Sequence, residues 1–167
     1  MTAATENNNS ARRLSRILLI FATLLLIAAC DRSVFFNESA RIDELGWNCS
    51  DRVSFHFDAA DTATTYLFCI DIRNTVDYPY SNIFFNIKSI FPDGAVAMDT
   101  NIEFQLALPD GQWLGKASGK YVDGRYPLCF FRFPEPGTYQ FFVGHAMRDT
   151  LLPGIKNIGL HIEKAGN

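Results

Sequence analysis

Alternation of apolar and polar residues is the feature that most limits what this chain can fold into. In residues 53–58 the apolar side chains Val53, Phe55 and Phe57 occupy every second position, and the odd positions of 139–143 are apolar in the same way. A period of two is typical of a strand with one buried face. Helical spacing with end caps is nowhere sustained, so the pattern predicts an all-β chain.

Turn signals divide the chain at short and fairly regular intervals. Proline presets one φ angle and glycine supplies a left-handed position in Pro92-Asp93-Gly94, Pro109-Asp110-Gly111, Asp123-Gly124, Pro136-Gly137 and Pro153-Gly154. Between these signals, the runs 66–72, 83–91, 102–108, 128–133 and 158–162 complete a set of about seven or eight strands. Short strands without intervening helices predict an antiparallel β-sandwich, with a closed barrel as the alternative.

The N-terminus has the layout of a lipoprotein signal peptide. Arg12, Arg13 and Arg16 precede an apolar run over 17–29, which ends in Ala28-Ala29 before Cys30. The run is too short for a membrane-spanning helix, which needs about 20 apolar residues, but it suits export followed by cleavage. Small residues before a cysteine resemble a bacterial lipobox, so we expect Cys30 to be acylated and to hold the protein at a bilayer.

These signals predict three segments. Residues 1–29 are a lipoprotein signal peptide that is removed, 30–45 are the lipidated N-terminus and tether, and 46–164 form the β-sandwich domain. The polar residues 31–45 would serve as a tether or as a first edge strand. Removal of the signal changes the net charge from −3 to −5, because three arginines and Glu6 leave with it. No basic footprint for nucleic acid remains.

Sites for metal or catalysis are not indicated by the sequence. The histidines His56, His145 and His161 are far apart and lack metal-type spacing, so we expect outward-facing strand positions, no metal and no cofactor. Nucleophile elbows and phosphate-binding loops are also missing, so we expect a protein that is not an enzyme. The mature cysteines besides Cys30 are Cys49, Cys69 and Cys129. We expect all three to be reduced, with Cys49 the most exposed.

The segment from Arg73 to Asn82 is the one polar and aromatic cluster that exceeds a simple turn. It is interpreted either as a structural loop, held by an arginine bond and packed tyrosine rings, or as a partner surface. The candidate partner-binding residues are Arg73, Asn74, Tyr78, Tyr80, Trp113 and Arg148. An exposed platform of aromatic rings, to which Tyr121 and Tyr126 could contribute, would instead favour a carbohydrate-binding module, whereas one apolar and arginine-containing patch would favour protein.

Several motifs along the mature chain also resemble a known family. They are Gly46-Trp47, Tyr66-Leu67-Phe68, Arg73-Asn74-Thr75 with Tyr78-Pro79-Tyr80-Ser81-Asn82, Asp99-Thr100, Pro109-Asp110-Gly111-Gln112-Trp113-Leu114-Gly115, Gly137-Thr138-Tyr139, Ala146-Met147-Arg148 and Gly159-Leu160-His161-Ile162-Glu163-Lys164. In this order the motifs resemble the gliding-motility lipoprotein GldH family. The resemblance implies a cell-envelope lipoprotein facing the periplasm, a non-catalytic accessory of gliding and its linked protein export. Its implied partners are envelope proteins of that machinery, together with the bilayer reached through Cys30.

Overall fold

The computed structural model describes residues 33–166, which contain eleven strands and no helix. The strands are β1 (Val34–Arg41), β2 (Trp47–Asn48), β3 (Val53–Ala59), β4 (Tyr66–Thr75), β5 (Asn82–Ile90), β6 (Val96–Gln105), β7 (Lys116–Ser118), β8 (Tyr121–Phe131), β9 (Gly137–His145), β10 (Leu151–Leu152) and β11 (Ile155–Lys164). The seven predicted runs are confirmed as strands, although several ends differ. The predicted signal peptide and Cys30 lie outside the described residues. Residues 33–166 contain no helix that could cross a membrane.

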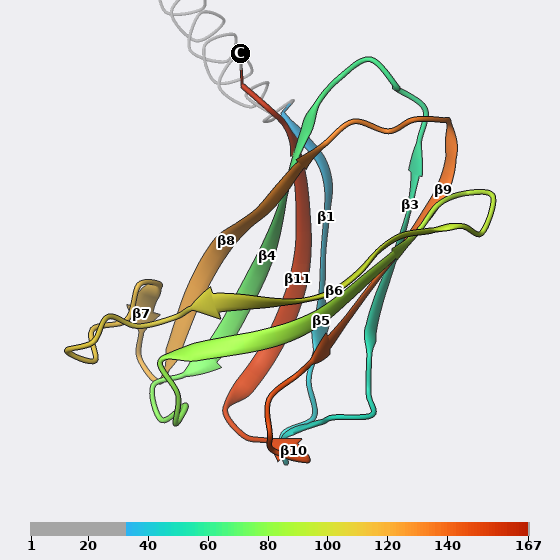
Figure 1. Ribbon diagram of the computed structural model, residues 1–167. Helices are drawn as coiled ribbons and strands as arrows, with labels where there is room; N and C mark the ends of the chain where they lie inside the picture. The colour runs from blue at the N-terminus through green and yellow to red at the C-terminus, as the bar shows by residue number, and fades with distance from the viewer. Residues whose placement is uncertain (1–32, 167) are drawn as a thin grey trace, which may run out of the picture. The chain divides into compact units, whose positions relative to one another are not determined.

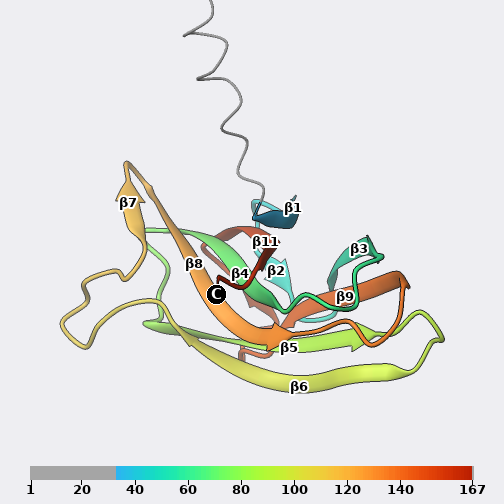
Figure 2. The same ribbon diagram turned by 90° about the horizontal axis from the view of Figure 1, so that it is seen from above.

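The strands form two antiparallel sheets that pack face to face. The first sheet has the order β1-β11-β4-β8-β7, the second has the order β3-β9-β5-β6, and β2 pairs with β10 as a short separate ribbon. Seen from above, β5 and β6 form a layer distinct from β4, β8 and β11 (Figure 2). The prediction of an all-β antiparallel sandwich is therefore confirmed.

The polar segment after Cys30 contributes an edge strand. β1 pairs with β11, and the register shifts between Val34 and Phe36. Because of this irregularity both adjacent phenylalanines turn inward: the ring of Phe35 lies 4.9 Å from that of Tyr66, and the ring of Phe36 lies 5.2 Å from that of Phe57. The folded domain thus begins at Val34, twelve residues before the expected boundary at 46, and the edge-strand alternative describes this segment.

β11, the last strand within residues 33–166, lies between β1 and β4. Its residue His161 is opposite Asn37 of β1 on one side and opposite Cys69 of β4 on the other. Figure 1 shows the end of β11 beside the start of β1. The two termini of the domain therefore lie at the same end of the sandwich, which we call the N-terminal end; the opposite end is called the distal end.

Alternation places the core as the sequence predicts. Phe55 and Phe57 of β3 are buried, whereas His56 between them is exposed, and Tyr139, Phe141 and Val143 of β9 are buried as well. The rings of Phe57 and Tyr139 stack with their centroids 6.0 Å apart. These side chains fill the space between the sheets.

The expected turn at Asp123-Gly124 is wrong. Both residues lie inside β8, where Gly124 is opposite Ile72 of β4. The glycine is needed for space, because a Cβ atom at position 124 would lie 2.5 Å from the ring of Tyr126. The turn before β8 instead uses Gly119, which has a φ of 59°.

Two of the three histidine expectations are also wrong. His56 faces outward, but His145 and His161 are 5% and 2% exposed. Nε2 of His145 lies 2.9 Å from the carbonyl oxygen of Trp47, and Nε2 of His161 lies 3.2 Å from a Glu163 carboxylate oxygen. Buried polar groups need such partners, which a strand pattern alone does not reveal.

The first test concerns the core. We expect Phe141→Ala to lower the free energy of unfolding by about 3 to 5 kcal/mol, because it removes a buried ring from a packed interior. His56→Ala, at an exposed position of the neighbouring strand β3, should change it by less than about 0.5 kcal/mol. Urea denaturation of both variants measures this difference. A larger loss for the histidine variant would contradict the assignment of faces.

Candidate functional site

The structure separates the six predicted partner-binding residues. Arg73 and Asn74 belong to β4, so the loop between β4 and β5 covers only 76–81. Asn74 and Tyr78 are 1% and 4% exposed, which removes both from the surface. Tyr80 and Arg148 lie together at the distal end, where they line one hollow.

Tyr78 holds the β4–β5 loop in place. Its hydroxyl donates a hydrogen bond to the backbone oxygen of Asn82, at 3.0 Å, and its ring meets the Tyr80 ring edge to face at 5.7 Å. Burial raises the pKa of the Tyr78 hydroxyl, which stays protonated as a donor. This residue fits the structural interpretation of the loop.

The distal hollow is a surface depression of about 450 Å³. Its lining residues come from the start of β5 with the loop before it, and from the segment that follows β9: Tyr80, Phe84, Ala146, Met147, Arg148 and Asp149. The two segments are joined by backbone, since the amide of Ala146 donates to the oxygen of Phe84 at 2.7 Å. The amide of Phe84 in turn lies 3.3 Å from the sulfur of Met147. The hollow is therefore built where two neighbouring inner strands of the second sheet, β5 and β9, begin and end.

Aromatic, apolar and charged groups are exposed side by side in the distal hollow. Tyr80 and Phe84 are 36% and 38% exposed. The Tyr80 hydroxyl donates to Asp149 at 2.7 Å, and this bond is the main cause that raises the pKa of Tyr80. Arg148 is exposed and forms no ion pair with the residues described here. Tyrosine and arginine beside an apolar surface are typical of protein interfaces.

The buried residue His145 directly precedes the segment that lines this hollow. Because a carbonyl oxygen only accepts hydrogen bonds, Nε2 of His145 must carry the proton that bonds to Trp47. Burial lowers the pKa of His145, which favours this neutral form. The bond ties the end of β9 to β2, so the 146–149 segment starts from a fixed position.

Arg73 lies in a second depression, on the outer face of the first sheet. We call this the outer groove; its volume is about 590 Å³. Two arginine–aspartate pairs cross from β4 to β8: Arg73 binds Asp123 at 2.6 and 3.0 Å, and Arg125 binds Asp71 at 2.7 and 2.8 Å. Asn37 and Asn157 add amide groups. The outer groove is therefore polar, with most of its charges already paired.

The remaining candidate rings form no exposed platform. Trp113 is half-buried against the core, and the ring of Tyr126 packs 6.1 Å from that of Phe104. Tyr121 lies beneath the cations of Arg73 and Lys120, at 5.6 and 5.2 Å. All three rings are only partly exposed, and they pack against different neighbours.

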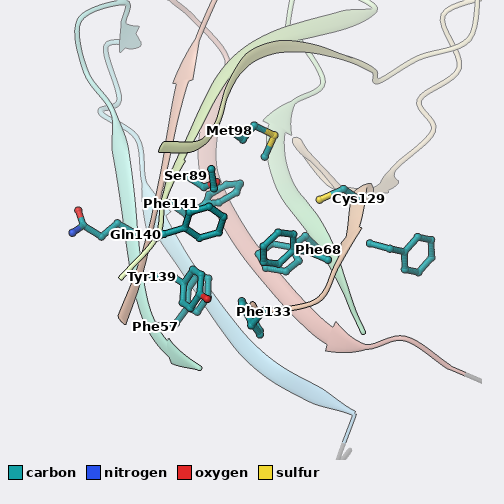
Figure 3. A pocket seen from close by; sticks show the side chains of 13 residues that line it. Phe57, Phe68, Ser89, Met98, Cys129, Phe133, Tyr139, Gln140 and Phe141 are labelled. Atoms are coloured by element: carbon teal, nitrogen blue, oxygen red, sulfur yellow. The ribbon is translucent and has the colours of Figure 1, made fainter. Parts of the chain in front are cut away.

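A third space lies between the sheets, toward the N-terminal end. It measures about 220 Å³ and is lined mainly by aromatic side chains. In Figure 3, Phe68, Phe133, Tyr139 and Phe141 point into this space, while Gln140 turns away from it. The space is apolar and offers few groups for binding chemistry.

Metal-binding side chains do not gather in the described part of the chain. Residues 33–166 contain no cluster of three or more histidine, cysteine or acidic side chains that could hold a metal ion. Cys49 is exposed, Cys69 buried and Cys129 half-buried, and all three are free thiols. Burial raises the pKa of Cys69 and Cys129, which disfavours the reactive thiolate.

Comparison with known proteins identifies the family. The sequence model of the GldH lipoprotein family matches residues 34–162, which is most of the described domain. The chain belongs to the GldH lipoprotein family. The matched range begins at the first residue of β1 and ends within β11, so the GldH family model spans the described domain from its first strand to its last.

Two curated members of the GldH family are similar over nearly their whole length. A protein of Christiangramia forsetii named gliding motility lipoprotein GldH homolog is 32% identical, covering 90% of this chain and 96% of that protein. The gliding motility lipoprotein GldH of Flavobacterium johnsoniae is 27% identical, with the same coverage. A solved glucuronidase of family GH115 is 10% identical with a TM-score of 0.45. This chain spans only 18% of that enzyme, and the similarity carries no information on function.

Four of the six residues that line the distal hollow were not among the candidates: Phe84, Ala146, Met147 and Asp149. Phe84 could have been found, because it is the outward aromatic position between the buried Ile83 and Phe85. Asp149 and Met147 gave no such signal, since they follow a strand and approach Tyr80 and Phe84 only through the pairing of β5 with β9.

The two neighbouring tyrosines provide a test of this geometry. We expect Tyr78→Phe to lower the free energy of unfolding by about 1 to 3 kcal/mol, because the part-buried bond to the Asn82 oxygen loses its donor. Tyr80→Phe removes a hydroxyl that water can replace, so its effect should stay within about 0.5 kcal/mol. Chemical denaturation of the two variants measures the difference in their free energies of unfolding. Equal losses would mean that Tyr80 is a packing residue.

Proposed function

We propose that this protein is a non-catalytic accessory of gliding motility and its linked protein export, and that it acts by binding another envelope protein through the distal hollow. Membership of the GldH family and the names of the two relatives support the process. The distal hollow supports the mode of action, since Tyr80, Phe84 and the unpaired Arg148 are displayed together. This combination matches the anchor residues of interaction hot spots.

Acylated Cys30 is the proposed attachment to the membrane. The lipobox at Ala28-Ala29-Cys30 supports it, as does the family description as a lipoprotein. In this proposal the domain faces the periplasm and is held by its N-terminal end, so the distal hollow points away from the bilayer. A partner could then reach the hollow without competing with lipid.

Carbohydrate binding in the outer groove is the second candidate. The specific observation in its favour is the set of arginine, aspartate and asparagine side chains at one polar surface. Two observations argue against carbohydrate binding: both arginines are already paired with aspartates, and no aromatic side chain is among the residues that line this groove. Protein binding at the distal hollow is therefore the main proposal.

The lipid attachment is tested with Cys30→Ser. Because the thiol is the acylated group, this variant should incorporate no labelled palmitate and should be lost from the detergent phase on phase partitioning. The wild type should be labelled and should partition with detergent. A Cys30→Ser protein that is still acylated and still cleaved after Ala29 would refute this attachment.

The interaction is tested with Arg148→Ala and Tyr80→Ala in a gliding host. Each should lower the amount of envelope protein crosslinked to the lipoprotein several-fold and should reduce spreading on surfaces, while the melting temperature changes little. Arg52→Ala removes an exposed arginine outside the hollow and is the matched control.

Arg73→Ala separates the two candidate functions. It alters the outer groove without touching the distal hollow, so crosslinking and spreading should stay at the wild-type level. If Arg73→Ala abolishes spreading while both hollow variants remain normal, the outer groove is the functional surface. If the hollow variants melt far below the wild type, their residues support the fold instead.

A further inference from the structure

The chain enters the sandwich very soon after the proposed anchor. The carbonyl oxygen of Ser33, the residue before β1, accepts a hydrogen bond from the amide of Lys164 at 2.8 Å, so the backbone is already joined to the end of β11 at this point. Only Asp31 and Arg32 separate Ser33 from Cys30. Three residue steps span at most about 11 Å, even when fully extended. If Cys30 is acylated, as proposed above, the N-terminal end cannot move far from the lipid surface.

An exposed aromatic ring lies level with this entry point. Val34 is opposite Glu163, Glu163 is opposite Leu67, and Leu67 is opposite Phe130, so these four residues form one row across the first sheet. Three strand spacings place Phe130 about 14 Å from Val34. Phe130 is 68% exposed, the most exposed aromatic side chain among the described residues, and Val34 is 38% exposed.

The polar groups near this row suit a lipid headgroup region. Arg132, two residues beyond Phe130, is exposed and makes no ion pair within residues 33–166, so its guanidinium is available to phosphate. The carboxylate of Glu163 lies 3.2 Å from Nε2 of His161. Because the mature chain carries a net charge of −5, general attraction to anionic lipids does not drive contact. An exposed aromatic ring beside a cation is instead the combination that suits local insertion into the headgroup region.

We propose that the N-terminal end of the sandwich rests on the bilayer, with Phe130 inserted at the boundary of headgroups and acyl chains. The bilayer is the occupant of this surface because a covalent link of two intervening residues keeps it within reach of Val34 and Phe130. The protein then has a fixed orientation: the row containing Phe130 faces lipid, and the distal hollow faces away. Figure 1 shows the separation of these two ends along the strands.

Fluorescence quenching tests this orientation in the lipidated full-length protein. The protein is reconstituted into vesicles of phosphatidylethanolamine and phosphatidylglycerol with brominated acyl chains, and the signal of wild-type Trp47 and Trp113 is subtracted. Phe130→Trp should lose most of its added fluorescence in brominated vesicles. Phe84→Trp, an exposed phenylalanine at the distal end, is the matched control and should lose none. Val34→Trp is a second reporter on the same row.

Each result has a definite meaning. Quenching of Phe130→Trp and Val34→Trp without quenching of Phe84→Trp supports the orientation. Absence of quenching at both row positions, in protein that mass spectrometry shows to be acylated, overturns the orientation but leaves the lipid anchor intact. Quenching at position 84 overturns it as well, because the distal end then faces lipid. Absence of the lipid itself overturns both the anchor and the orientation.

Discussion

Between the two sheets, the rings of Phe57, Phe133 and Tyr139 lie 4.8 to 6.0 Å apart and come from β3, from the segment after β8, and from β9. Each such ring contributes about 1.5 to 3 kcal/mol when it is fully buried. Because side chains alternate along a strand, burying one set of residues in this aromatic contact fixes which residues face solvent. The outer groove and the exposed row at the N-terminal end both consist of residues that this alternation places on the solvent side.

Strand identity could be predicted from the sequence because alternation depends only on neighbouring residues. β3 and β9 follow the pattern closely, with Phe55 and Phe141 inside and His56 outside. The errors arose where a distant partner changes the meaning of a local signal. Asp123-Gly124 reads as a turn, but Asp123 binds Arg73 and Gly124 makes room for the Tyr126 ring.

The candidate site was predicted only in part, for the same reason. Tyr80 and Arg148 were named as partner-binding residues, and the structure brings them to one hollow. Tyr80 and Asp149 are 69 residues apart, and no local pattern joins them. Their approach follows from the register in which Phe85 is opposite His145, since residues next to a paired position are also neighbours. Asn74 and Tyr78 show the reverse error, because their types suit a surface while their positions are buried.

The position of β11 has a consequence for the order of folding. β1 is the first strand of the domain, and its backbone pairs only with β11 in the described part of the chain. Residues such as Asn37 and His161, 124 positions apart, must therefore meet before the first sheet is complete. Contacts over such separations form slowly, and the unpaired edges of β1 and β4 are exposed to aggregation in the meantime. The first sheet is thus completed only after β11 has left the ribosome, so β1 waits for its partner during most of the synthesis of this domain.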